Sequence, residues 1–164
     1  EQVAKVIYSI TTNKLEDIKS FYKVVIMNYL LKNGDAHLKN FGLLFDDDFK
    51  NIFYSPVYDV VNTVVYIHKD KPALMLDGKK IWHSKDTLIK FGQKSCLLSQ
   101  SEANKYYKEC YEALIWAIDE LENYLNEYPD FKIVKMMLDS WKLSLKEVSI
   151  KELDNDIIRT WKNY

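Results

Sequence analysis

One eight-residue segment, Asn33 to Asn40, holds most of the side chains that could do chemistry. It reads Asn-Gly-Asp-Ala-His-Leu-Lys-Asn and lies between two apolar stretches. Polar loops held by rigid neighbours are common places for catalytic groups. Asp35 and Asn40 are five residues apart, so one short loop could aim the carboxylate at an acceptor hydroxyl and the amide at a metal ion bound to phosphates. Lys39, between them, could neutralise charge on a transferring phosphoryl group.

A second carboxylate supports the same chemistry. Asp59 follows Asp35 by 24 residues and lies in a run of valines and a tyrosine. A carboxylate in apolar surroundings is costly unless it is paired or binds a cation. Two plainer interpretations stay open for the residues taken alone. In the first, the 33–40 segment is an ordinary turn with Lys39 as a solvated charge; in the second, Asp59 caps a helix that begins at Val60.

Taken together, these segments resemble the C-terminal lobe of the HipA-type toxin kinases, which are bacterial serine/threonine kinases of toxin–antitoxin modules. The order matches that of protein kinases in general, in which the catalytic Asp and Asn are followed by a strand pair and then by a metal-binding Asp. The resemblance covers residues 15–128 well and the rest of the chain loosely. It rests on Asn33-Gly-Asp-Ala-His-Leu-Lys-Asn-Phe-Gly-Leu-Leu, on Ser55-Pro-Val-Tyr-Asp-Val-Val-Asn-Thr63 and on Ala73-Leu-Met-Leu-Asp-Gly-Lys-Lys80.

The resemblance implies a role for each matching residue and a Mg²⁺–ATP-dependent transfer of a phosphoryl group to a protein hydroxyl. Asp35 takes the place of the catalytic base. Asn40 and Asp59 take the places of the Mg²⁺ ligands. ATP is then the phosphoryl donor and Mg²⁺ the cofactor. The nucleotide-binding residues implied in this way are His37, Lys39, Asn40, Tyr58 and Asp59.

The family also implies partners and a cellular place. The partners are a protein substrate, an antitoxin protein, and an N-terminal ATP-binding lobe encoded in the same gene or separately. The protein would contact DNA only indirectly, through an antitoxin complex, and would be located in the cytoplasm. Only 34 residues precede Asp35 and no Gly-rich phosphate loop occurs among the 164 residues. We therefore expect the chain to be the C-terminal lobe alone, to hold half of an ATP site, and to be inactive by itself.

Two other functions stay open. The first is a non-catalytic binding lobe that docks an antitoxin or a separately encoded N-terminal lobe. The second is a metal-dependent phosphohydrolase with Asp35, His37 and Asp59 as metal ligands. The phosphohydrolase is the weaker of the two, because two-metal hydrolases need more carboxylate and histidine ligands than this region offers.

Composition indicates one folded domain over residues 1–164. Apolar residues make up 48% of the chain and the formal net charge is −1, values that exclude a disordered chain and a global nucleic-acid footprint. The two cysteines cannot form a disulfide framework and are interpreted as buried thiols in a reducing compartment. No apolar run approaches the roughly 20 residues that a membrane span needs. Arg159 is the single arginine, so bidentate phosphate or base recognition by arginine is almost excluded.

Apolar periodicity predicts a mainly α domain, a protein-kinase-like C-terminal lobe with two short β-hairpins. Asn13 and Glu16 have the spacing of a capping box, which predicts that a helix begins there. The apolar stripe that follows runs up to Gly34, and glycine is common directly after the C-terminal end of a helix. Residues 3–10 fit either a helix or a strand. The remaining expected elements are hairpins over 41–54 and 73–82, the second turning at Asp77-Gly78, and helices over 85–91, 99–128, 131–147 and 149–161.

Two further capping boxes support these helix boundaries. Ser99 with Glu102 marks the start of the long helix, and Ser149 with Glu152 marks the start of the last one. Pro129 separates the long helix from the next, because proline cannot continue a helix that precedes it.

Overall fold

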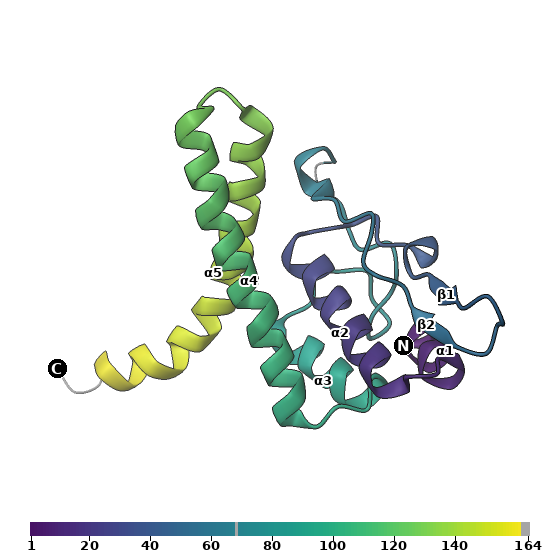
Figure 1. Ribbon diagram of the computed structural model, residues 1–164. Helices are drawn as coiled ribbons and strands as arrows, with labels where there is room; N and C mark the ends of the chain where they lie inside the picture. Colours follow the sequence, from purple (N-terminus) through teal and green to yellow (C-terminus); the bar gives the residue numbers. More distant parts are fainter. Residues whose placement is uncertain (68, 162–164) are drawn as a thin grey trace.

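The structure is a computed structural model that describes residues 1–67 and 69–161, with side chains described as far as Lys146. Helices dominate it and one short hairpin interrupts them, which confirms the mainly α fold (Figure 1). The α-helices are α1 (Gln2–Ile10), α2 (Lys14–Leu30), α3 (Lys85–Ser95), α4 (Gln100–Glu127) and α5 (Lys132–Trp161). The strands are β1 (Leu43–Phe45) and β2 (Ile52–Tyr54), and two short 3₁₀ turns are η1 (Leu38–Asn40) and η2 (Thr63–Val65).

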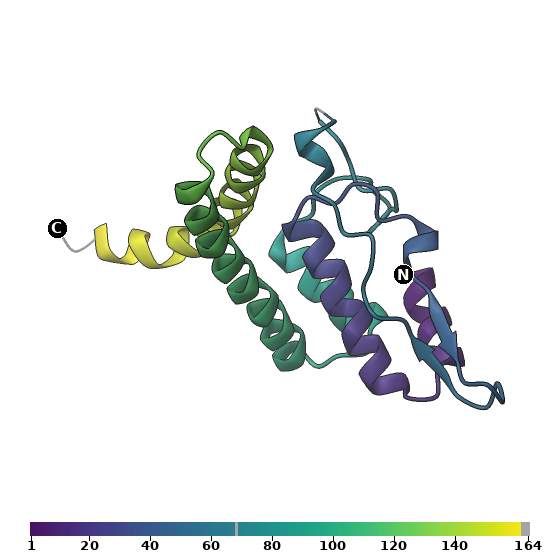
Figure 2. The same cartoon turned by 45° about the horizontal axis from the view of Figure 1, so that its top comes forward.

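Helix α2 is the centre of the fold. It contacts α1 and β2 on one side and α4 on the other (Figures 1 and 2). The hydroxyl of Tyr22 donates a hydrogen bond of 3.3 Å to the carbonyl of Ala103 in α4, so the polar tip of this fully buried ring is satisfied. Each fully buried large apolar side chain contributes about 1.5–3 kcal/mol to folding. The apolar side chains that α2 buries are Ile18, Phe21, Tyr22, Ile26 and Leu30.

The two ends of α2 differ from the sequence-based expectation. Asn13 is the N-cap residue but its side chain makes no capping hydrogen bond, so the capping box predicted there is wrong. The helix ends at Leu30, and Lys32, not Gly34, takes the left-handed conformation after it, with φ at +58°. Gly34 is required for a different reason, because a Cβ atom there would collide with the Asp70 carboxylate.

The first predicted hairpin is confirmed and the second is reduced to its turn. Strands β1 and β2 pair antiparallel, with Leu44 opposite Phe53. Between 73 and 82 a single bridge joins Leu76 to Lys79 around the turn at 77–78, and the flanking residues form no strands. The reason is packing: the chain before Leu76 turns onto α2, and Leu76 itself is buried in the core.

Both ends of the chain are helical, and the last two predicted helices form a single helix. Residues 3–10 belong to a helix, α1, which buries Ala4 and Ile7. The capping box at Ser99 is complete, since Glu102 N–H donates to Ser99 Oγ at 3.2 Å and Ser99 N–H donates to Glu102 Oε2 at 2.9 Å. The backbone of α5 continues without the break predicted near Ser149, and the side chains of that second capping box lie outside the described ones. The N-terminal half of α4 packs against α2 and α3, whereas its C-terminal half and the start of α5 form a helical hairpin that projects from the body (Figure 1).

Burial also settles the state of the two cysteines. Cys96 and Cys110 are free and buried, as predicted. Burial raises the pKa of the Cys96 thiol to about 12 and that of Cys110 to about 11, so both stay protonated at neutral pH and are poor nucleophiles. None of the helices in the described part of the chain is long and apolar enough to cross a membrane.

We predict that Leu114→Ala lowers the free energy of unfolding by about 2–5 kcal/mol, because Leu114 is fully buried in α4 and the change leaves a cavity. Leu143→Ala is the matched control, since Leu143 is 55% exposed on α5 and its loss should change stability by less than about 0.5 kcal/mol. Urea unfolding followed by far-ultraviolet circular dichroism measures both. Equal losses would contradict the assignment of the core.

Candidate functional site

Asn33 joins the three parts of the site. Its amide nitrogen donates to Asn28 Oδ1 in α2 at 2.8 Å and to the carbonyl of Asp59 at 3.3 Å. Its amide oxygen accepts the Asp35 backbone N–H at 3.1 Å. The side chain is 2% exposed, and a buried amide with all these bonds is a strong local constraint. The end of α2, the loop that carries Asp35 and the segment that carries Asp59 are therefore tied to one residue.

Asn40 and Asp59 are in direct contact although 19 residues separate them. The Asn40 amide nitrogen donates to Asp59 Oδ2 at 2.5 Å, and its oxygen accepts the His37 backbone N–H at 3.1 Å. Asn40 is buried and Asp59 is exposed. Asp59 has φ at +56°, an uncommon conformation for a residue with a side chain, and one that is frequently found at functional sites. The structure thus brings together the two residues that the sequence nominates as metal ligands.

A second bond joins the same two segments. The hydroxyl of Tyr58 donates to the carbonyl of Lys39, while the Lys39 side chain itself is exposed. Gly42, two residues after Asn40, allows the close approach, because a Cβ there would lie 3.2 Å from the Tyr58 hydroxyl. Tyr58 and Lys39 are therefore positioned beside the Asn40–Asp59 pair.

Asp35 and His37 complete the set of nominated residues. Asp35 is exposed, and its carbonyl accepts the His37 N–H at 2.7 Å, so the chain turns tightly between them. His37 is half-buried, and within the described part of the chain its Nδ1 is buried without a hydrogen-bond partner. No helix begins at Val60, which excludes the interpretation of Asp59 as a helix cap.

The donor set at the site suits Mg²⁺. Carboxylate and amide oxygens are the protein ligands that Mg²⁺ prefers, and it usually takes only one or two of them beside water and phosphate oxygens. The Asp59 carboxylate, which accepts a hydrogen bond from the Asn40 amide nitrogen, could hold the ion together with the Asn40 amide oxygen, which accepts the His37 backbone N–H. Among the described residues no three His, Cys, Asp or Glu come together, so the phosphohydrolase site of Asp35, His37 and Asp59 has no support.

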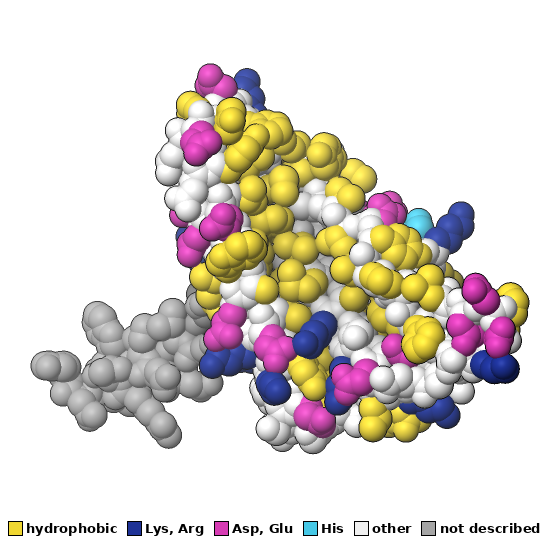
Figure 3. Space-filling view, viewed as in Figure 1, with side chains coloured by type: hydrophobic (Ala, Val, Ile, Leu, Met, Phe, Trp, Pro, Cys, Tyr) yellow, Lys and Arg dark blue, Asp and Glu magenta, His cyan; other side chains and the backbone are white. Residues whose placement is uncertain are grey.

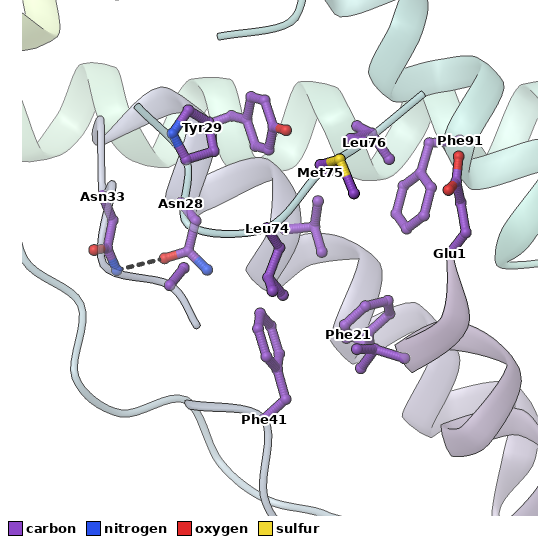
Figure 4. A pocket seen from close by; sticks show the side chains of 14 residues that line it. Glu1, Phe21, Asn28, Tyr29, Asn33, Phe41, Leu74, Met75, Leu76 and Phe91 are labelled. Atoms are coloured by element: carbon purple, nitrogen blue, oxygen red, sulfur yellow. Dashed lines mark hydrogen bonds between the residues drawn. The ribbon is translucent and has the colours of Figure 1, made fainter. Parts of the chain in front are cut away.

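An apolar pocket lies behind this loop and was not predicted. The side chains of Phe41, Leu74, Met75 and Phe91 line it together with α2, and Asn33, bonded to Asn28, stands at one end (Figure 4). The lining of the pocket is mainly apolar, with Glu1, Asn28 and Asn33 as its polar members. Its relevance is that the same Asn33 faces both the pocket and the nominated residues.

The chain belongs to the family of HipA-like C-terminal domains, whose family model matches residues 1–118. It is 34% identical over 59 residues to the Sinorhizobium fredii protein named "Putative kinase Y4dM", a match that covers 36% of this chain and 14% of that protein. It is 34% identical over 65 residues to "Putative kinase Y4mE" of the same species, covering 40% of this chain and 15% of the relative. A Haemophilus influenzae protein named "Putative kinase" is 35% identical over 66 residues, covering 40% and 19%. The matches span less than a fifth of the length of these relatives.

Sequence reasoning missed the residues that hold the site together. From the sequence, Asn33 is a turn residue of the 33–40 segment and Thr63 is the last residue of a motif, and neither is assigned a role. One signal could have pointed to Asn33: Asn28 interrupts the apolar stripe of α2 with a buried amide, and such a group needs a partner nearby.

We predict that Asn33→Ala destabilises the fold by about 1–3 kcal/mol, because it leaves the Asn28 amide and the Asp35 N–H without their partner. Asn104→Ala is the control, since Asn104 is exposed on α4 and, within the described residues, its side chain bonds only to the helix carbonyl of Gln100. Thermal unfolding measures both variants. A loss for Asn33→Ala no larger than that for the control would show that Asn33 is not the joining residue.

Proposed function

We propose that the chain is the catalytic C-terminal lobe of a serine/threonine protein kinase that transfers the γ-phosphoryl group of Mg²⁺–ATP to a protein hydroxyl. The observation that carries this proposal is the contact of Asn40 with Asp59 beside Asp35, made by two segments on either side of a hairpin. Membership of the HipA-like family and the kinase names of three partial relatives support it.

The roles follow from the chemistry of the side chains. Asp35 would accept the proton of the acceptor hydroxyl as that oxygen bonds to the γ-phosphorus, and ADP would leave with the electrons of the broken bond. Asn40 and Asp59 would hold Mg²⁺, which when bound neutralises charge on the phosphates. Lys39, exposed on the same loop, would place a positive charge near the transferring group.

His37 and Tyr58 would contribute to nucleotide binding by holding the 33–40 loop in shape. Tyr58 ties its own segment to the carbonyl of Lys39. The buried His37 Nδ1, which has no partner among the described groups, remains able to accept or donate one hydrogen bond. Both residues therefore belong to the nucleotide-binding part of the proposal.

A second function, a binding lobe that docks another lobe or an antitoxin, is favoured by exposed apolar side chains around the same segments. Leu38 and Val57 are 63% and 57% exposed, and exposed apolar groups clustered at a polar site are typical of a covered surface. We propose accordingly an N-terminal ATP-binding lobe as a partner, and a toxin–antitoxin role in the cytoplasm, with DNA contacted only through the antitoxin.

We predict that Asp35→Asn in the full-length protein reduces phosphoryl transfer by about a hundredfold or more, because an amide cannot take the hydroxyl proton. ATP binding should stay within about twofold, since Asp35 contacts the acceptor and not the nucleotide. Transfer of radiolabelled phosphate and equilibrium dialysis measure the two quantities. Asp47→Asn is the control, because Asp47 is exposed in the turn between β1 and β2. Labelling at the parental rate by the Asp35 variant would exclude Asp35 as the base.

We also predict that Asp59→Ala eliminates Mg²⁺-dependent transfer in the full-length protein, because the carboxylate is the only charged member of the proposed pair. The helical circular dichroism spectrum should be unchanged, since Asp59 is exposed. Initial rates over a Mg²⁺ titration measure the effect, with Asp47→Ala as the control. An unchanged Mg²⁺ titration would remove Asp59 from the metal site.

A further inference from the structure

Thr63 occupies the place where the two loops of the site meet. Its hydroxyl oxygen accepts the Gly34 backbone N–H at 2.7 Å, and its own N–H donates to the Lys32 carbonyl at 3.2 Å. The hydroxyl also donates to the carboxylate of Asp70. Thr63 is only 7% exposed. The bonds to Gly34 and Lys32 join the segment that follows Asp59 to the segment that precedes Asp35, and the bond to Asp70 lies within the segment that follows Asp59.

The Thr63–Asp70 pair suits this task chemically. A hydroxyl is the smallest side-chain group that can accept one hydrogen bond while donating another. A carboxylate acceptor fixes the hydroxyl proton, because charge-assisted bonds are stronger than neutral ones, and a lone pair is left facing Gly34. Asp70 is itself held in place, since its Oδ1 accepts the Lys71 N–H at 2.8 Å and its carbonyl accepts the Trp82 indole N–H at 3.1 Å.

Close packing completes the contact. A Cβ atom on residue 34 would lie 2.8 Å from Thr63 Oγ1 and would overlap the Asp70 carboxylate. Glycine is thus the one residue that lets the backbone before Asp35 reach this pair. The site therefore depends on a bare backbone on one loop and a Thr–Asp pair on the other.

We propose that Thr63 and Asp70 are positioning residues that hold the backbone of Asp35 at a fixed place relative to Asp59. This inference deepens the proposed kinase function and rests on it. The bond to Gly34 is one residue from Asp35, and Thr63 is four residues from Asp59. Loss of the pair would let the base drift from the acceptor hydroxyl while leaving the metal pair, Asn40 and Asp59, in place.

The first test observes the Gly34 amide directly and needs no activity. The chain has four glycines, and Asn33-Gly34 is its single Asn-Gly pair, so labelling with ¹³C-carbonyl Asn and ¹⁵N-Gly isolates one amide signal. We expect Thr63→Val to shift that signal and to speed its hydrogen exchange by about tenfold or more, because a bonded amide becomes free. Thr63→Ser keeps the hydroxyl and should preserve both properties.

A matched control is available elsewhere in the fold. The Thr12 hydroxyl also accepts a backbone N–H, that of Ile52 at 2.9 Å, beside β2 and away from this pair. Thr12→Val should leave the Gly34 signal unchanged. An unshifted and equally protected Gly34 amide in Thr63→Val would overturn the proposal.

The second test uses the full-length protein and separates positioning from folding. Thr63→Val should lower kcat by about tenfold or more while KM for ATP stays within about twofold, because misplacing a base affects the chemical step alone. Thr63→Ser should restore kcat, and Asp70→Asn should give an intermediate loss. A full kcat in Thr63→Val, or a kcat loss that serine does not restore, would overturn the positioning role.

The two tests also separate this proposal from the kinase proposal. If the parental full-length protein transfers no phosphate while Thr63→Val frees the Gly34 amide, the kinase assignment fails and, with it, the role of Thr63 in catalysis, although the contact itself stands. If Asp35→Asn keeps full transfer activity, Asp35 is not the base and Thr63 has no base to position. If Asp35→Asn is inactive and Thr63→Val is fully active, only the positioning proposal fails.

Discussion

The ring of Phe21 is the point on which both loops of the site depend. Phe41, which follows the first loop, packs edge-on against it at 5.5 Å between ring centroids, and Tyr54, which precedes the second loop, does so at 5.9 Å. Phe91 of α3 contacts the same ring at 6.2 Å. Because Phe21 lies in the buried face of α2, its contacts with Phe41 and Tyr54 fix the points at which the two loops leave the core. Polar bonds then need to fix only the short stretches between these anchors.

Much of the fold could be predicted from the sequence, because apolar periodicity and capping residues indicate where its helices lie. The long helix and its Ser99–Glu102 cap are confirmed in detail. The prediction of a second hairpin was wrong. The Asp77-Gly78 pair specifies a turn, but it does not determine whether the flanking residues pair with each other or pack on α2. The end of α2 was wrong for a similar reason: Gly34 was assigned by propensity, and a tertiary contact decides its place.

The nominated residues of the site could also be found from sequence, because chemistry limits their types and spacing. What could not be found was their support. The apolar side chains exposed on the surface give no sequence cue either, and Figure 3 shows how widely they spread over one face of the molecule. Thr63 and Asp70 lie seven residues apart on an irregular segment, where no periodicity predicts which side chains point inward. The group that Thr63 binds is the backbone N–H of Gly34, and a backbone N–H cannot be recognised from residue type. The glycine itself is the one sequence feature that this contact requires.

The hydrogen bonds around Asn33 and Gly34 also affect the rate at which Asn33 can deamidate. An Asn-Gly pair is prone to deamidation, because the unhindered glycine nitrogen attacks the asparagine side-chain carbonyl, ammonia leaves, and water opens the ring to aspartate or isoaspartate. In the folded chain that nitrogen donates its N–H to Thr63 and the Asn33 side chain is buried and bonded to Asn28. The attack therefore requires local opening. The rate of deamidation in this loop is thus limited by how rarely the fold lets the loop open, and each completed deamidation adds a negative charge two residues before Asp35.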